Sequence, residues 1–84
     1  KWLRKAAAQG SPVAQYNLAD LYQQGKGVKQ NLVEACFWIT LSEQRKFAPA
    51  RVARQKLLDQ LTSDQQTQID RRVRAWSANK AQKE

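Results

Sequence analysis

Apolar residues recur at three- and four-residue spacing in five segments of the chain, and short polar stretches with glycine or proline separate these segments. This spacing predicts amphipathic helices, because residues i, i+3, i+4 and i+7 lie on one face of a helix. The pattern therefore predicts an all-α fold of about five helices.

Helix-capping residues bound the first two segments. A first helix is expected over residues 1–9, followed by Gly10, a residue that adopts positive φ without strain. A second helix should run from Pro12 to about Gln24, since proline is favoured at the first helical position. Two glycines that stop this helix follow it, Gly25 and Gly27.

The third segment is apolar on more than one side, which is typical of a helix packed between neighbours. Asn31 should cap its start, and Glu34 stands where its carboxylate can reach back to the cap amide, as in a capping box. We expect this central helix to bury the apolar residues Leu32, Ala35, Phe37, Trp38, Ile39 and Leu41.

Two further helices are expected in the second half of the chain. Pro49 fits only the first turn of the fourth helix, and Thr62 or Ser63 caps the fifth, with Gln65 or Gln66 at the return position. The fifth helix should fray beyond its last large apolar residue. Its apolar stripe comprises Ile69, Val73 and Trp76.

The formal net charge of +8 raises the question of a nucleic-acid partner. Basic residues are spread over the whole chain, whereas a phosphate-binding face clusters them on one stripe. Solvation of the surface is thus the favoured interpretation, and binding of nucleic acid or an anionic surface is the alternative. The densest basic group, expected on the outer side of the last helix, is Arg71, Arg72 and Arg74, backed by Lys80 and Lys83.

The residue types in the sequence give little support for catalytic activity. The chain has no histidine, and its one cysteine, Cys36, stands in an apolar run typical of a buried helix. The acidic residues are dispersed, and the glycines at 25 and 27 lack the strand and lysine of a phosphate loop. We expect no enzyme activity, cofactor or metal. No apolar run approaches the roughly 20 residues needed to span a bilayer.

A repeat period is visible in the tryptophans. Trp2 and Trp38 stand thirty-six positions apart, at matching points of two amphipathic segments. A period of this length with paired helices is typical of an α-solenoid, whose units bury their faces on one another.

The spacing of small, aromatic and glycine residues resembles the Sel-one-like repeat family, which is related to the tetratricopeptide repeats. The resemblance implies antiparallel helix pairs in right-handed superhelical stacking. It covers residues 1 to about 43, where the second helix of one unit precedes a full unit. The matching residues of the full unit are Ala14, Leu18, Tyr22, Gly25, Gly27, Val28, Asn31, Ala35 and Trp38.

The remainder departs from the repeat pattern. Ala19 replaces a glycine of the family, Arg54 stands where the preceding unit has Leu18, and no second glycine pair appears. We therefore divide the chain into one and a half repeats over residues 1–46 and a degenerate half-repeat with a C-terminal capping helix over residues 47–84.

The resemblance implies a protein–protein interaction scaffold, with a protein or peptide as partner and a bacterial, periplasmic or secreted setting. In related repeats the first helix of each pair lines the concave surface. The contact positions expected on that surface are Asn17, Asp20, Gln24 and Lys56. Trp2 and Leu3 should be partly exposed at the N-terminal edge, which favours self-association there.

Overall fold

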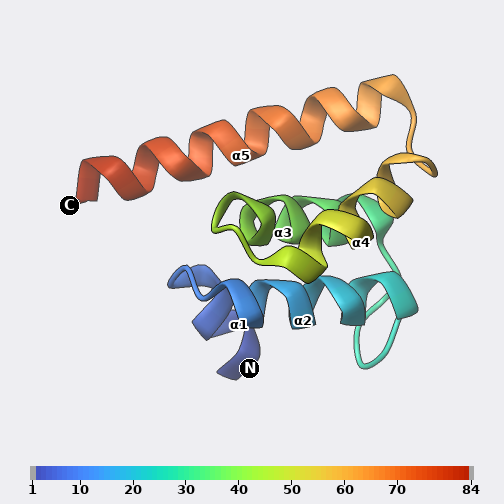
Figure 1. Cartoon of the computed structure of the whole chain (residues 1–84), viewed down its shortest axis with the longest axis horizontal. Coiled ribbons are helices and arrows are strands. Elements are labelled where there is room, and N and C mark those ends of the chain that lie inside the picture. The colour runs from blue at the N-terminus through green and yellow to red at the C-terminus, as the bar shows by residue number, and fades with distance from the viewer. Residues whose placement is uncertain (1, 84) are drawn as a thin grey trace.

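The computed structural model describes the backbone of residues 2–83 and the side chains of residues 2–78. It contains five helices and, in this range, no strand (Figure 1). The predicted all-α fold of about five helices is therefore confirmed. The helices are α1 (Trp2–Ala8), α2 (Pro12–Gln24), α3 (Leu32–Gln44), α4 (Ala48–Leu58) and α5 (Ser63–Lys83).

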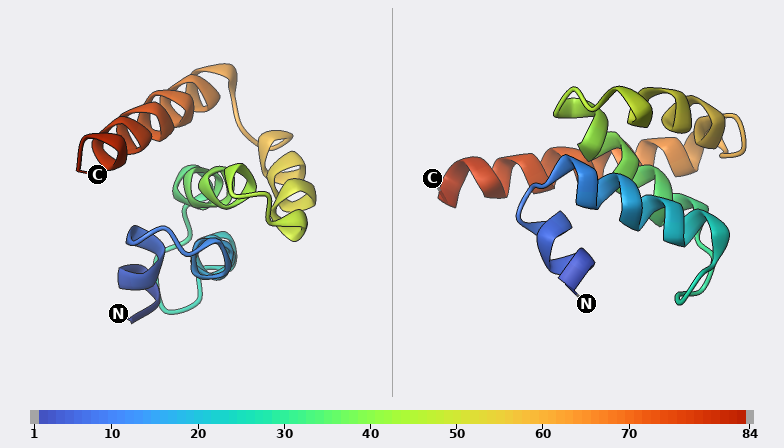
Figure 2. Two further views of the ribbon diagram at one scale, coloured as in Figure 1. Left: turned by 60° about the vertical axis from the view of Figure 1, so that its left-hand side comes forward. Right: turned by 60° about the horizontal axis from the view of Figure 1, so that its bottom comes forward.

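Helix α3 is the centre of the molecule, because it packs against α2, α4 and α5, whereas α1 packs mainly against α2. Figure 2 shows α5 along one side of this group and α1 on the other. The prediction of a central third helix is confirmed by burial on several of its sides. Its buried residues are Ala35, Cys36, Phe37, Ile39, Thr40, Leu41 and Ser42.

Helix caps form where the sequence predicts them, with one correction. The Thr62 and Gln65 side chains form a reciprocal capping box, with distances of 3.1 and 2.9 Å to the opposite backbone amides. Asn31 caps α3 by accepting from the Glu34 amide at 3.1 Å. The Glu34 side chain does not return this bond, however, because the Asn31 amide donates to the carbonyl of Tyr22 at 3.0 Å. The predicted capping box at α3 is therefore wrong in its second half.

Helix α5 is longer than the sequence suggests. Ile69 and Val73 are buried against the α3 core and Trp76 is half-buried there, as predicted. The backbone then stays helical to Lys83, so the expectation of fraying directly beyond Trp76 is wrong for the backbone. Alanine, lysine and glutamine, which recur in this part of the sequence, have good intrinsic helix propensity.

The apolar interior consists of two clusters of different size. The larger contains residues of α3, α4 and α5 together with Ala19 of α2, and the smaller contains Ala7, Ala14 and Leu18 at the α1–α2 contact. Tyr22 and Trp38 border the smaller cluster and are half-buried, less than the substantial burial expected of them. Both side chains also pack against the larger cluster, so they lie between the two.

Arg54 occupies the position that Leu18 has in the preceding repeat, and it makes polar contacts there. Its guanidinium donates from Nε to Thr40 Oγ1 at 3.2 Å and lies 3.5 Å from a Glu43 carboxylate oxygen. This polar contact joins α4 to α3 where the preceding unit uses apolar packing. The right-handed sense of stacking stays a prediction, since one complete repeat does not define a superhelix.

Candidate interaction surfaces

Helices α2 and α4 both pack on α3 and meet along one side of it. The concave surface is expected on this side of the molecule. The Tyr16 and Phe47 rings meet edge to face, with 5.3 Å between their centres. The cavity between these helices holds only about 20 Å³, so this surface is nearly filled by its own side chains. Its lining residues are Tyr16, Ala19, Asp20, Gln23, Ile39, Ala53 and Leu57.

Of the four residues predicted for this surface, only Asp20 lines the cavity between α2 and α4. Asn17, Asp20 and Gln24 are exposed along α2, at the three- and four-residue spacing that shares one helix face. Gln24 donates from Nε2 to Asp20 Oδ1 at 2.8 Å. Lys56 is exposed on α4.

The basic group of α5 is divided by its surroundings. Arg71 and Arg74 are exposed, as the sequence predicts. Arg72 is exposed as well, at 44% of its side chain, but its guanidinium reaches to α3, where it forms an ion pair with Glu34 and lies 4.1 Å from the centre of the Phe37 ring. All three arginines are therefore solvent-accessible, and one of them is already paired. The side chains of Lys80 and Lys83 lie outside the described residues.

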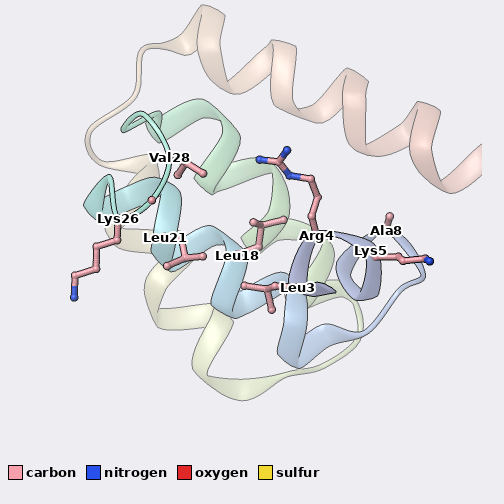
Figure 3. Close-up of a pocket in the computed structure, with 9 residues that line it drawn as sticks. Leu3, Arg4, Lys5, Ala8, Leu18, Leu21, Lys26 and Val28 are labelled. Carbon is pink, nitrogen blue, oxygen red and sulfur yellow. The ribbon is translucent and has the colours of Figure 1, made fainter. Parts of the chain in front are cut away.

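The sequence analysis missed a groove that lies between α1 and α2. It has a volume of about 650 Å³ and runs between α1, α2 and the loop after α2 (Figure 3). We call it the N-terminal groove. Its lining residues are Leu3, Arg4, Lys5, Ala8, Leu18, Leu21, Lys26, Gly27 and Val28.

The charged residues of the N-terminal groove are all basic. Arg4 donates to the Tyr22 hydroxyl at 2.9 Å, and Lys5 and Lys26 are exposed. No described carboxylate lies within ion-pairing distance of these three side chains. Two sequence signals point to this groove: residues 1–30 hold five basic side chains and one acidic one, and Leu21 follows Leu18 by three positions.

Cys36 is the only cysteine, and it is fully buried in α3. Burial raises the pKa of its thiol, while a hydrogen bond with Thr40 and the charge of Arg54 act in the opposite direction. A neutral, enclosed thiol is a poor nucleophile. Among the described residues, no group of three or more histidine, cysteine or acidic side chains could hold a metal ion.

Comparison with known proteins adds the family. Residues 1–11 and 12–43 match the Sel1 repeat model. The chain belongs to the Sel1 repeat family. The second match contains α2 and nearly all of α3, and the first contains α1. No curated protein and no solved structure matches the chain significantly.

The Sel1 assignment fits the paired helices and the glycine-bounded turn between α2 and α3. Repeats of this family generally serve protein–protein interaction. Within the described range, no helix combines the length and the apolar character required to cross a bilayer.

Proposed function

We propose that this Sel1 repeat domain is a non-catalytic scaffold that binds a protein or peptide along α2, with α4 bordering the site. The observation that carries the proposal is the exposed polar row of Asn17, Asp20 and Gln24. These side chains stand on a helix that is fixed by the core and present hydrogen-bonding groups at regular spacing. Such a row suits an extended peptide or a partner helix.

The chemistry of the described side chains supports a binding role over a catalytic one. Asp20 and Gln24 bond to each other on the surface, and no second carboxylate meets Asp20 as a partner for acid–base work. The one thiol is enclosed in the core. Binding by surface complementarity requires neither a nucleophile nor a base.

Affinity capture with two matched baits tests the proposal. The first bait carries Asn17→Arg and Gln24→Arg, and the second carries Gln68→Arg and Ser77→Arg at exposed positions of the remote helix α5, so both add two positive charges. A protein recovered by the wild type and the α5 variant, but lost with the α2 variant, would support the proposal. Equal recovery with all three baits would contradict it.

Self-association through the N-terminal edge is a second candidate, favoured by one observation. Trp2 is 73% exposed, which is unusual for so large an apolar side chain. Sedimentation over a wide concentration range tests this candidate. Dimers that disappear with Trp2→Gln are the expected result, and a monomer at the highest concentration would reject it.

Binding of nucleic acid stays the alternative. Arg71 and Arg74 are available for phosphates, whereas Arg72 already holds Glu34 and Phe37. We expect weak affinity for labelled DNA or RNA that falls steeply with salt and ignores sequence. Submicromolar binding at physiological salt, lost on replacing the three arginines, would favour this alternative over the scaffold.

A further inference from the structure

We propose that the partner bound along α2 is an extended segment with charges of both signs, which places a basic side chain beside Asp20 and an acidic side chain beside Lys56. The proposal rests on the protein-binding role given above and concerns the same site. It adds the chemistry of the partner, which the polar row on α2 alone does not define.

Helices α2 and α4 carry opposite charges, although the chain as a whole has a net charge of +8. Asp20 is the only charged residue of α2. Helix α4 has three basic residues and no acidic one. The α2 side of the site is therefore negative, and the α4 side is positive.

Asp20 and Lys56 occupy equivalent positions on the two helices. They stand thirty-six positions apart, which is also the spacing of Trp2 and Trp38. Asp20 lines the small cavity between α2 and α4 together with Ala53. Ala53 precedes Lys56 by three positions and so shares its side of α4. Both charges therefore border the contact between α2 and α4.

Neither charge is neutralised within the part of the chain that the structure describes. Asp20 accepts a hydrogen bond from the neutral side chain of Gln24 at 2.8 Å. The two ion pairs between described side chains join α3 to α4 and to α5, and neither includes Asp20 or Lys56. Both residues are exposed. A partner therefore reaches both charges without first breaking an ion pair.

The polar row of α2 differs from the faces that pack against other helices. Leu57 of α4 packs at the contact with α2, and its equivalent one repeat earlier is Leu21, which is not part of the row. A unit stacked on α2 through Leu21 would thus leave the row accessible. The buried residues of α2, none of which belongs to the row, are Ala14, Gln15, Leu18 and Ala19.

An exposed apolar side chain extends the row by one turn. Val13 stands four positions before Asn17 and is 51% exposed. Exposed ion pairs contribute little to affinity, so contact of Val13 with an apolar side chain would supply affinity, while the two charges supply selectivity. The partner segment is thus expected to combine an apolar residue with a basic and an acidic one.

Nucleic acid and a second copy of the chain fit this site less well. The phosphates of a nucleic acid would pair with Lys56 but would be repelled by Asp20, and such repulsion selects against a partner. A second copy carries complementary charges at the same two positions, but its net charge of +8 opposes its approach. The opposite charges of the two helices therefore favour a segment with both signs.

Fluorescence anisotropy with designed peptides tests the proposal. Each labelled peptide has one leucine and two charged residues in a background of serine and glycine. Packed helices lie about 8–10 Å apart and an extended chain rises about 3.3 Å per residue, so the two charges are placed about three residues apart. The mixed peptide carries lysine and glutamate, in either order, and the controls carry two lysines or two glutamates. The wild type should bind the better mixed peptide at least about fivefold more tightly than either control.

Single charge reversals locate the two pairs. Asp20→Lys places positive charges at both positions, so this variant should prefer the peptide with two glutamates. Lys56→Glu places negative charges at both positions and should prefer the peptide with two lysines. The matched controls Asp64→Lys and Arg74→Glu change the net charge equally at exposed positions of α5. They should keep the wild-type preference at physiological salt. Circular dichroism and melting show whether each variant is folded.

Each contrary result overturns the proposal. If the wild type bound the peptide with two glutamates best, general attraction to a basic chain would explain the binding. Equal shifts in preference with Asp20→Lys and Asp64→Lys would show that net charge decides. Labelled DNA that bound more tightly than the mixed peptide, and was lost with Lys56→Glu, would assign the site to nucleic acid. Dimers abolished by Asp20→Lys and restored by mixing this variant with Lys56→Glu would show that a second copy fills the site.

The test also separates this inference from the proposed scaffold function. The capture experiment replaces Asn17 and Gln24 and leaves both Asp20 and Lys56 in place. If capture depended on α2 but the peptides showed no binding or no preference for mixed charge, the scaffold function would stand and the charge assignment would be rejected.

Discussion

The two sides of the helix stack are covered in different ways. On one side, α5 lays Ile69 and Val73 on the core of α3, and Arg72 reaches over Phe37 to Glu34. On the other side, α1 contributes only Ala7 as a fully buried side chain, and Trp2 stays 73% exposed. One side is thus closed and the other is open.

Because of this difference, the side covered by α5 contributes most to stability, and the side covered by α1 offers more surface for contacts. The closed side holds most of the large buried side chains, so most of the stabilising apolar area lies there. The open side combines the partly buried Leu3 and Leu21 with the exposed Lys5 and Lys26 at a groove. The outer face of α5 carries the exposed arginines Arg71 and Arg74, whereas α1 exposes the large apolar side chain of Trp2.

The first prediction compares the two sides directly. Ile69→Ala should lower the free energy of unfolding by about 3 kcal/mol, because the side chain is fully buried and its removal leaves a cavity. Leu3→Ala removes a half-buried side chain at an open groove and should cost about 1 kcal/mol. Urea denaturation followed by circular dichroism gives both values. Equal costs would contradict the distinction between a closed and an open side.

The second prediction concerns the two glycines of the loop that borders the groove. Gly25 and Gly27 have φ values of +70° and +73°, so a side chain at either position is strained. At Gly25 an added Cβ would also lie 3.2 Å from Cβ of Gln30, whereas nothing lies within 4 Å at Gly27. Gly25→Ala should therefore cost about 2 kcal/mol and Gly27→Ala about 1 kcal/mol.

Thermal melting of the two alanine variants ranks these costs. Gly25→Asn serves as a control, because asparagine tolerates the left-handed conformation better than alanine. A melting temperature for Gly27→Ala below that of Gly25→Ala would show that the close approach to Gln30 carries no cost.

The third prediction tests how α5 is fastened to α3. Arg72→Ala removes an ion pair and a contact with the face of Phe37, and should cost about 1 kcal/mol. Both partners are partly exposed, so a double-mutant cycle with Glu34→Ala should give a coupling of only about 0.5 kcal/mol. This coupling should shrink at high salt. If Arg72→Ala and Arg74→Ala lowered the free energy of unfolding equally, the contacts of Arg72 would not stabilise the packing of α5 on α3.

The sequence allowed prediction of the features that depend on local pattern. Helix existence, the N-caps at Asn31 and Thr62 and the burial of Ile69 follow from spacing and cap chemistry, which act within a few residues. Glu34 could not be assigned correctly in this way. Its nearest option was the Asn31 amide, but α5 brings Arg72 beside it from far along the chain.

The groove was missed for a related reason. The sequence analysis placed Leu18 in the repeat motif and interpreted the basic residues, which are spread over the chain, as solvation of the surface. Their combination at one site depends on how α1 crosses α2 and how the loop places Val28. Such geometry arises from tertiary packing, which periodicity does not contain.

The last prediction uses Cys36 to report on the closed side. Folding raises the pKa of this thiol mainly through burial, and the nearby Asp70 of α5 acts in the same direction. The thiol of the unfolded chain loses its proton near pH 9.0, and at that pH the native state still retains it. The contribution of Cys36 to the free energy of unfolding is thus intact below this pH and falls as the pH rises above it, by at most about 1.4 kcal/mol per pH unit. Cys36→Ala should remove this part of the pH dependence.

The rate at which Cys36 reacts with a thiol reagent then distinguishes the side covered by α5 from the side covered by α1. Modification requires the thiol to become accessible, so its rate reports the opening of the helices that cover α3. Ile69→Ala loosens the cover formed by α5 and should speed the reaction markedly, whereas Leu3→Ala should leave the rate near that of the wild type. If Leu3→Ala sped the reaction as much as Ile69→Ala, both sides would open together, and the separation of a stabilising side from an open side would not hold.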